Sequence, residues 1–168
     1  AIKLINKIRK ITKDPKFPIL IDEEGIDVSR LSKFFNHAFS QRLFGNIYNL
    51  NPKICMTFYK NYIDMISSLL KKIGININTL PVLDVLRKNT HKIIGNRAFS
   101  NDPHIVKTLG LICVKQFKAN KIGTVIKHIP GHGGAKSDSH LKMPQVKLNY
   151  KNLNSTDFLP FKSNSSAF

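Results

Sequence analysis

The stretch GTVIKHIPGHGGAKSDSH, residues 123–140, is the part of the chain that decides the fold. Its first four residues are mostly β-branched and predict a buried strand. The remainder mixes glycine and proline with three histidines, two lysines and an aspartate, so it predicts a polar loop. A buried strand that opens into such a loop is where α/β enzymes usually place their chemistry.

Three interpretations of this loop are open. The simplest is a turn-rich loop whose histidines have no function. The second is a metal site, whose ligands would be His128, His132, Asp138 and His140. These residue types suit zinc. The third is an acid/base loop, in which Asp138 orients His140 for proton transfer. Lys127 and His128 would then hold a polar substrate.

Further blocks of sequence accompany this loop in a fixed order. KHIPGHGGAKSDSH (127–140) is preceded by ILIDEEGIDVSR (19–30), ININTLPVLDV (75–85) and IGNRAFSNDP (94–103). DFLPFK (157–162) follows it. Together they resemble the KHFPGHGxxxxDSH, IDQEGGRVQR, INFAPVLDV, GxRSFxxDP and D-x-x-P-F motifs of glycoside hydrolase family 3. The resemblance is to its β-N-acetylhexosaminidases, which trim N-acetylglucosamine from bacterial cell-wall fragments, and it runs from about Phe17 to the C-terminus.

The resemblance implies a role for each residue that falls on these motifs. Asp138 and His140 correspond to the dyad that serves as general acid/base. The positions that correspond to substrate-binding residues are Asp22, Arg30, Arg97, Lys127 and His128. Charged side chains suit this task because they make charge-assisted hydrogen bonds to sugar hydroxyls. The resemblance implies neither a metal nor an organic cofactor.

Two departures from the family pattern bear on the site. Gly25-Ile26-Asp27 stands where the family has Gly-Gly-Arg, so we expect this loop to follow a different path or to carry strain at the β-branched residue. The position of Arg30 depends on that path. The family's aspartate nucleophile, which forms a covalent intermediate in a retaining reaction, lies on a later strand, past residue 168.

The expected activity is therefore hydrolysis of terminal β-linked N-acetylglucosamine from peptidoglycan-derived fragments, with the nucleophile absent from this chain. The alternative is a non-catalytic, truncated or degenerate remnant of such an enzyme. The two interpretations differ in whether a downstream aspartate is supplied.

Strand and helix patterns alternate along the chain. Strands are expected at residues 18–22, 75–85 and 123–127. Helices are expected at 1–11, from Asn51-Pro52 to Gly74, from Asp102-Pro103, and from about Tyr150 through Pro160. Alternation predicts a parallel sheet, but a complete TIM barrel takes about 250 residues. We expect an α/β fold, namely the N-terminal and central strand–helix units of a partial (β/α)8 barrel, in one domain (1–168) that is incomplete at both ends.

The chain carries a net charge of +17, which could indicate nucleic-acid binding. However, its lysines are dispersed, and only 5 of its 27 basic residues are arginine, which phosphate and base recognition favours. Abundant lysine, asparagine and isoleucine are typical of A/T-rich codon usage. We therefore expect no nucleic-acid partner, and a carbohydrate substrate such as muropeptides that contain N-acetylglucosamine.

The remaining composition bears on cellular context. Cys55 and Cys113 lie on the apolar faces of expected helices and are interpreted as core residues. No disulfide framework is implied, so a cytoplasmic location is expected. No apolar run approaches the roughly 20 residues of a membrane span, so we expect no membrane association. A complete enzyme is expected to be a monomer.

Overall fold

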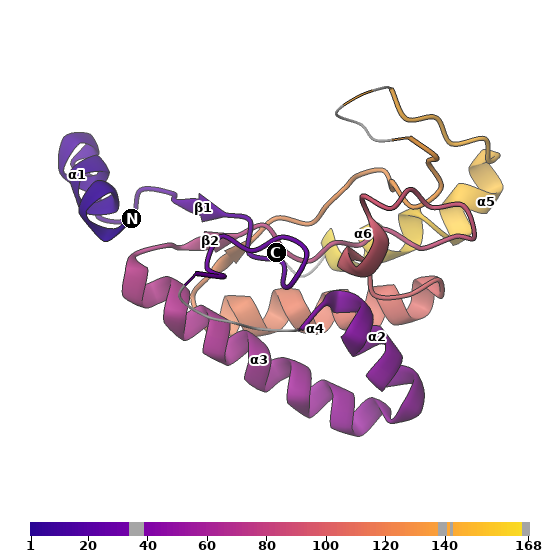
Figure 1. Ribbon diagram of the computed structural model, residues 1–168, viewed down its shortest axis with the longest axis horizontal. Helices are drawn as coiled ribbons and strands as arrows, with labels where there is room; N and C mark the ends of the chain where they lie inside the picture. Colours follow the sequence, from indigo (N-terminus) through magenta and orange to yellow (C-terminus); the bar gives the residue numbers. More distant parts are fainter. Residues whose placement is uncertain (34–38, 138–140, 142, 166–168) are drawn as a thin grey trace.

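The computed structural model describes residues 1–33, 39–137, 141 and 143–165, which form an α/β fold (Figure 1). Its elements, in chain order, are α1 (Ile2–Thr12), β1 (Leu20–Ile21), α2 (Gln41–Leu50), α3 (Pro52–Ile73), β2 (Ile77–Asn78), the short 3₁₀ helix η1 (Gly95–Arg97), α4 (Pro103–Ala119), β3 (Gly123–Thr124), α5 (Tyr150–Ser155) and α6 (Phe158–Ser165). Helices α1 and α5 lie at opposite ends of the molecule.

The three strands form one parallel sheet in the order β1-β2-β3. Leu20 lies opposite Ile77 in the first pair, and Asn78 lies opposite Thr124 in the second. Helices α2 and α3 connect β1 to β2, and α4 connects β2 to β3, so each crossover contains a helix. The predicted α/β class and its parallel, sequential strand order are confirmed.

The regular strands are shorter than the sequence suggests. Residues 75–85 were expected to form one strand, but only Ile77 and Asn78 pair regularly on both sides. An isolated parallel bridge between Val82 and Lys127 continues the contact further along. Pro81 interrupts the ladder because proline has no N–H to donate. The chain beyond the regular strands is therefore extended but irregular, and it carries the polar residues of the candidate site.

The expected helix ends of α3 and α4 are confirmed. The side chain of Asn51 accepts a hydrogen bond from the backbone N–H of Ile54 at 3.1 Å, and α3 ends at Gly74 with a φ of 88°. The side chain of Asp102 accepts one from the N–H of His104 at 2.8 Å. These caps satisfy backbone groups that the helix itself leaves unpaired, and they define where the two crossover helices begin.

Two features differ from the expected helices. Helix α2 was not predicted, and the single C-terminal helix that was expected is divided into α5 and α6. The division falls at Asp157, which is buried and forms an ion pair with Arg87. Pro160 lies in the first turn of α6, where its missing N–H leaves no intrahelical hydrogen bond unmade. A polar tertiary contact thus overrides a locally continuous helical pattern.

The core lies between the sheet and helices α2, α3 and α4. Its largest fully buried side chains include Phe44, Tyr59 and Phe99. Cys55 and Cys113 are buried in it as free thiols, as expected, and burial raises their pKa to about 11 and about 12. Among the described residues, no helix is long and apolar enough to cross a membrane.

Candidate functional site

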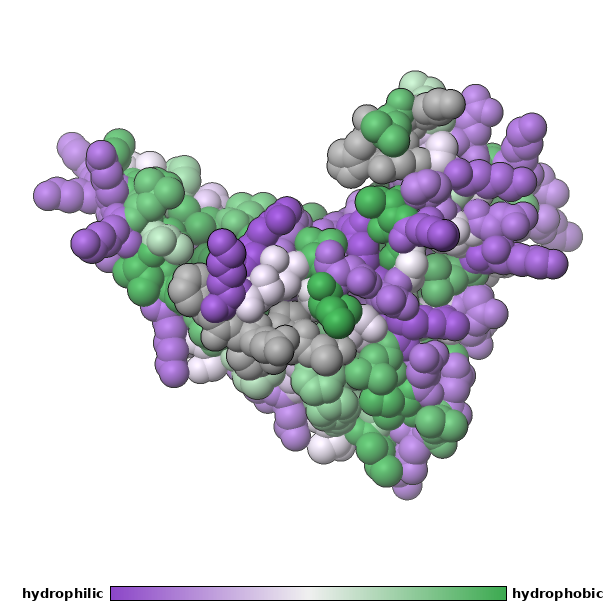
Figure 2. All heavy atoms as spheres, viewed as in Figure 1, coloured by the Kyte–Doolittle hydropathy of each residue, from purple (hydrophilic) through white to green (hydrophobic). Residues whose placement is uncertain are grey.

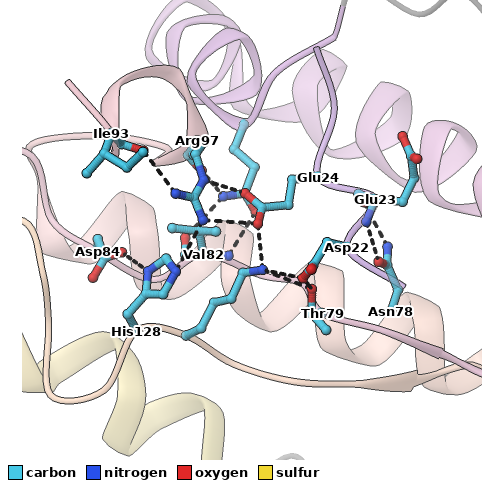
Figure 3. Close-up of polar contacts among 12 residues, drawn as sticks. Asp22, Glu23, Glu24, Asn78, Thr79, Val82, Asp84, Ile93, Arg97 and His128 are labelled. Carbon is cyan, nitrogen blue, oxygen red and sulfur yellow. Dashed lines mark hydrogen bonds and ion pairs between the residues drawn. The ribbon is translucent and has the colours of Figure 1, made fainter. Parts of the chain in front are cut away.

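The candidate site lies where the three strands end. Asp22 directly follows β1, Thr79 follows β2, and Lys127 comes three residues after β3. The Lys127 Nζ donates to Asp22 Oδ1 at 3.2 Å and to Thr79 Oγ1 at 2.9 Å, and the Thr79 hydroxyl donates to Asp22 (Figure 3). The carboxyl end of a parallel sheet is the usual place for a ligand, and here it gathers polar side chains from three strands.

A buried carboxylate, Glu24, holds two of the predicted binding residues. Its Oε1 lies 2.5 Å from Lys127 Nζ, and its Oε2 accepts from Arg97 Nε at 2.7 Å. A second hydrogen bond of 3.1 Å joins Arg97 Nη2 to Oε1, which makes the Arg97 contact bidentate. Because the Glu24 side chain is only 2% exposed, its charge requires such partners. Glu24 therefore fixes the positions of both cations.

His128 is held between a carboxylate and a guanidinium group. Its Nδ1 lies 2.6 Å from Asp84 Oδ2, and its Nε2 lies 3.2 Å from Arg97 Nη2. Arginine can only donate, so Nε2 accepts and the ring proton resides on Nδ1, from which it is donated to Asp84. Asp84 is fully buried and also accepts from the N–H of His132 at 2.6 Å. One carboxylate thus orients the imidazole and anchors the following loop.

The electrostatics of the site favour charged side chains. A hydrogen bond from Thr79 holds the pKa of Asp22 below its usual range, and the Lys127 ammonium adds to this effect. Burial acts to lower the pKa of Arg97, but its hydrogen bonds and charge pairing with Glu24 outweigh this and raise the pKa. Both groups are therefore ionised throughout the neutral range.

Arg97 is placed by elements on both sides of it. It ends η1, and its Nη1 donates to the carbonyl oxygen of Ile93 at 2.9 Å. The side chain of Gln41, at the start of α2, donates to the carbonyl oxygens of Arg97 and Val82 and accepts from the N–H of Val82. Helix α2 therefore ties the segment that carries Arg97 to the sheet.

The loop that departs from the family pattern follows a path without strain at Ile26. Gly25 has a φ of +123°, and a Cβ there would overlap the carbonyl oxygen of Phe39. Among the described residues other than glycine, only residues 13 and 121 have positive φ, so Ile26 does not. Of the two expected outcomes, positive-φ strain at Ile26 is therefore not found, and a path different from the family's stays a prediction.

Arg30 is placed by a turn that Glu23 holds. The Glu23 Oε2 accepts from the N–H groups of Arg30 and Leu31 at 2.9 and 3.0 Å and from the Ser29 hydroxyl at 3.1 Å. The Arg30 side chain is exposed, and it contributes to the lowered pKa of Asp22 through its charge. Arg30 thus stands at the rim of the site while the other cations lie deeper.

These side chains line one open cavity of about 460 Å³. It is lined by Asp22, Glu24, Val28, Arg30, Ile93, Ile94, Arg97, Lys127, His128 and His132. All five residues that the resemblance assigns to substrate binding are therefore brought together. The proposed acid/base residues Asp138 and His140 lie outside the described residues.

The metal-site alternative is not tested by the described residues alone. Within them, no three His, Cys, Asp or Glu side chains are grouped so that they could hold a metal ion. Two of the four ligands in that alternative, Asp138 and His140, fall outside them. The other two, His128 and His132, have ring centroids 6.2 Å apart.

The sequence interpretation missed the residues that support the binding groups. Glu24, Asp84, Thr79 and Gln41 were given no role, yet each holds a predicted residue or its backbone in place. One signal was present, since Asp84 interrupts the apolar run PVLDV. A carboxylate buried in such a run needs a cationic or hydrogen-bonding partner.

Comparison with known proteins assigns the chain to a protein family. Residues 3–166 match the family described as "Glycosyl hydrolase family 3 N terminal domain". Beta-hexosaminidase A of Pseudoalteromonas piscicida is 33% identical over 164 residues, which cover 95% of this chain and 27% of that protein. A Beta-hexosaminidase of Xylella fastidiosa (strain 9a5c) is 27% identical over 166 residues, covering 99% of this chain and 49% of that protein.

Solved structures agree. The crystal structure of NagZ from Neisseria gonorrhoeae in complex with N-trifluoroacetyl-D-glucosamine superimposes with a TM-score of 0.87 at 28% identity, covering 99% of this chain and 50% of that one. The chain belongs to glycosyl hydrolase family 3 and matches its N-terminal domain. It spans about half or less of the length of these relatives. The predicted family and the partial-barrel α/β fold are confirmed.

Proposed function

We propose that the polypeptide that carries this chain hydrolyses terminal β-linked N-acetylglucosamine from peptidoglycan-derived fragments. The observation that carries the proposal is the single cavity lined by Asp22, Arg30, Arg97, Lys127 and His128. Relatives named beta-hexosaminidase, and a NagZ structure with an N-acyl glucosamine bound, support a sugar as the ligand. We further propose a cytoplasmic, monomeric enzyme that uses neither a metal nor an organic cofactor.

The accessible groups of the cavity suit vicinal sugar hydroxyls. The Asp22 side chain is 48% exposed, and its Oδ1 receives Lys127 and Thr79, so its Oδ2 remains to accept from a hydroxyl. Arg30 is exposed at the rim and can donate to a neighbouring oxygen. A carboxylate beside a guanidinium gives the paired acceptor and donor that a diol needs.

Lys127 and Arg97 act mainly as preorganised charges. The Lys127 ammonium has three N–H donors, and it contacts Asp22, Thr79 and Glu24. These contacts hold a fixed cation next to Asp22 before any ligand arrives. A site that is ordered in advance loses less free energy on binding than one whose side chains must be immobilised.

The catalytic steps rest on residues of the same loop and on a later segment. Asp138 would orient His140, which would protonate the leaving glycosidic oxygen and then deprotonate the attacking water. An aspartate nucleophile from beyond residue 168 would attack the anomeric carbon and form the covalent intermediate of a retaining reaction. The chain alone supplies the sugar cavity and the acid/base loop but not this nucleophile.

The experiment is turnover of an aryl N-acetyl-β-D-glucosaminide by the polypeptide that carries this chain. His140→Ala should lower kcat by about 10²–10⁴, which is the usual contribution of general acid/base catalysis. His104→Ala is the matched control, because this histidine is exposed near the start of α4. Unchanged kcat in His140→Ala would disprove the dyad. Absence of turnover in the unmodified product would favour the non-catalytic alternative.

A further inference from the structure

Two clefts are lined in part by the segment that follows Asp84. One, of about 540 Å³, is lined by Arg87, Lys88, Lys136 and Lys147 together with Met143 and Leu148. The other, of about 700 Å³, shares Arg87 and Lys88 and adds Arg42, Asn96 and Asn101. The two clefts share Arg87 and Lys88, and we call them together the basic groove.

The basic groove contains five cationic side chains, and none of its described lining residues is an acid. Arg87 is held in place by an ion pair to the buried Asp157. Lys88, Lys136 and Lys147 are exposed, and within the described part of the chain no ion pair involves them. Figure 2 shows hydrophilic side chains gathered over the end of the molecule that carries α5, and Lys147 comes three residues before α5 begins.

The basic groove adjoins the sugar cavity along one loop. His132 lines the cavity, and Gly134, two residues later, lines the groove. Successive Cα atoms are about 3.8 Å apart, so these two lie within about 8 Å of each other. The loop is tied down where it passes, because the Thr90 hydroxyl donates to the carbonyl oxygen of Gly133 at 2.6 Å. The cavity and the groove are therefore neighbours along this loop.

We propose that the basic groove is a subsite for the acidic aglycone of the substrate, with Lys88, Lys136 and Lys147 binding its carboxylates. This inference rests on the proposed function, since it requires a glycoside in the adjoining cavity. Three lysines on flexible stems suit several carboxylates spread along a peptide, because each ammonium binds as an independent point charge. Met143 and Leu148 offer apolar contact to the alkyl parts of such a chain.

A single-stranded nucleic acid fits the same groove less well. Sequence-tolerant binding of single strands relies on aromatic side chains on which bases stack. The described lining of the basic groove contains no aromatic residue. Its arginines are also committed elsewhere, Arg87 to Asp157 and Arg42 to the carbonyl oxygen of Phe99. The groove thus matches dispersed carboxylates better than a phosphodiester backbone.

The test compares two β-N-acetylglucosaminides by isothermal titration against the full chain. In one, the aglycone is a short peptide with two carboxylates, and in the other both carboxylates are amidated. The acidic glycoside should bind more tightly at low salt, and the difference should shrink at about 0.5 M salt because exposed charges are screened. The free acidic peptide and a single-stranded oligonucleotide are titrated alongside.

Two triple variants with the same change in net charge locate the effect. Lys88→Gln/Lys136→Gln/Lys147→Gln should lower the affinity for the acidic glycoside by about tenfold, since exposed ion pairs each contribute little. The affinity for the amidated glycoside should stay unchanged. The control replaces exposed lysines of α3 and α4, Lys53→Gln/Lys60→Gln/Lys115→Gln, and should change neither.

The outcomes separate this inference from the proposed function. Equal affinities for the two glycosides, or equal effects of the two triple variants, would overturn the subsite while leaving the sugar cavity intact. If neither glycoside binds, the proposed function fails, and binding of the free peptide decides whether the groove takes carboxylates at all. Tighter binding of the oligonucleotide than of the acidic peptide would overturn the assignment to an aglycone.

Discussion

The lysine of the proposed sugar cavity and the lysines of the basic groove differ in burial and in ion pairing. In the cavity, Lys127 is only 15% exposed and contacts two carboxylates, those of Asp22 and the buried Glu24. In the groove, Lys136 and Lys147 are exposed without an ion pair to any described residue. Burial of a charge is costly unless it is paired, so the cavity pairs its buried cations, Lys127 and Arg97, while the groove leaves its lysines in water.

The difference indicates two roles for the same side chain. A paired and buried cation is fixed in direction, so it positions a ligand and the groups around it. An exposed lysine keeps its rotamer freedom and a screened charge, so it attracts anions of varied shape without fixing them. Substitutions in the cavity should therefore change stability and sugar affinity together, whereas substitutions in the groove should change only the affinity for acidic ligands.

The largest effect is expected from Glu24→Gln. This change removes a buried charge that pairs with both Arg97 and Lys127, and breaking a buried ion pair destabilises proteins by about 3–5 kcal/mol. Denaturant unfolding measures the loss. Asp27→Asn is the matched control, because Asp27 is an exposed acid in the same loop, and it should cost less than about 0.5 kcal/mol. A loss of under 1 kcal/mol for Glu24→Gln would show that the cavity cations do not depend on pairing.

A smaller effect is expected from Gly133→Ala, on the loop between the cavity and the groove. A Cβ there would overlap the backbone carbonyl of Val85, which cannot move away as a side chain can. Overpacking of this kind costs about 1–3 kcal/mol, and it should also weaken sugar binding because His132 adjoins it. Thermal unfolding and a sugar titration measure the two effects.

The control for that prediction is Gly123→Ala in β3, where the added Cβ would lie 3.1 Å from Cγ1 of Ile77 and at an ordinary contact distance of 3.5 Å from the carbonyl oxygen of Asn76. This variant should unfold close to the parent protein. Equal unfolding temperatures and equal sugar affinities of the two alanine variants would mean that the loop around Gly133 shifts easily. The loop between the cavity and the groove would then not be rigid.

The smallest effect concerns the ionisation of Asp22. Its pKa is lowered in the folded state chiefly by the Thr79 hydroxyl, so Thr79→Val should raise it. A carboxylate with a depressed pKa contributes stability above its unfolded pKa and loses it as pH falls through the folded value. The ionised form of Asp22 is the one proposed to accept a hydrogen bond from the sugar. As pH falls, Thr79→Val should therefore begin to lose sugar affinity at a higher pH than the parent.

Carboxyl carbon NMR of labelled Asp22 across pH 2–6 (about two units to either side of a typical aspartate) measures this directly. Thr79→Ser, which keeps the hydroxyl, should titrate as the parent does. An unchanged titration in Thr79→Val would assign the lowered pKa to the cations Lys127 and Arg30 instead.

Local sequence signals predicted the helices whose ends are marked by capping residues. Asn51-Pro52 and Gly74 delimit α3, and the caps form as expected. Helix α2 lacks such a strong pattern, although Ser40 caps it. Its role, which is to hold Arg97 and Val82 through Gln41, depends on contacts more than 40 residues away in sequence. Such long-range contacts leave no periodic trace in the sequence.

The candidate site divides in the same way. The resemblance located Lys127 and His128, because these residues belong to a recognisable block of sequence. Glu24 and Asp84 hold Lys127 and His128 in place, but this role follows from burial and pairing in three dimensions. Burial of an acid can be suspected from an apolar neighbourhood, while its partner is found only once the strands are placed side by side.

The most direct test of the central claim is backbone amide NMR of the 168-residue chain titrated with N-acetyl-D-glucosamine. If the cavity holds the sugar, chemical-shift changes should cluster at residues 22–30, 93–97 and 127–132 and disappear in Asp22→Ala, with D-glucose producing weaker changes. Shifts that lie elsewhere, or that persist unchanged in Asp22→Ala, would contradict the account.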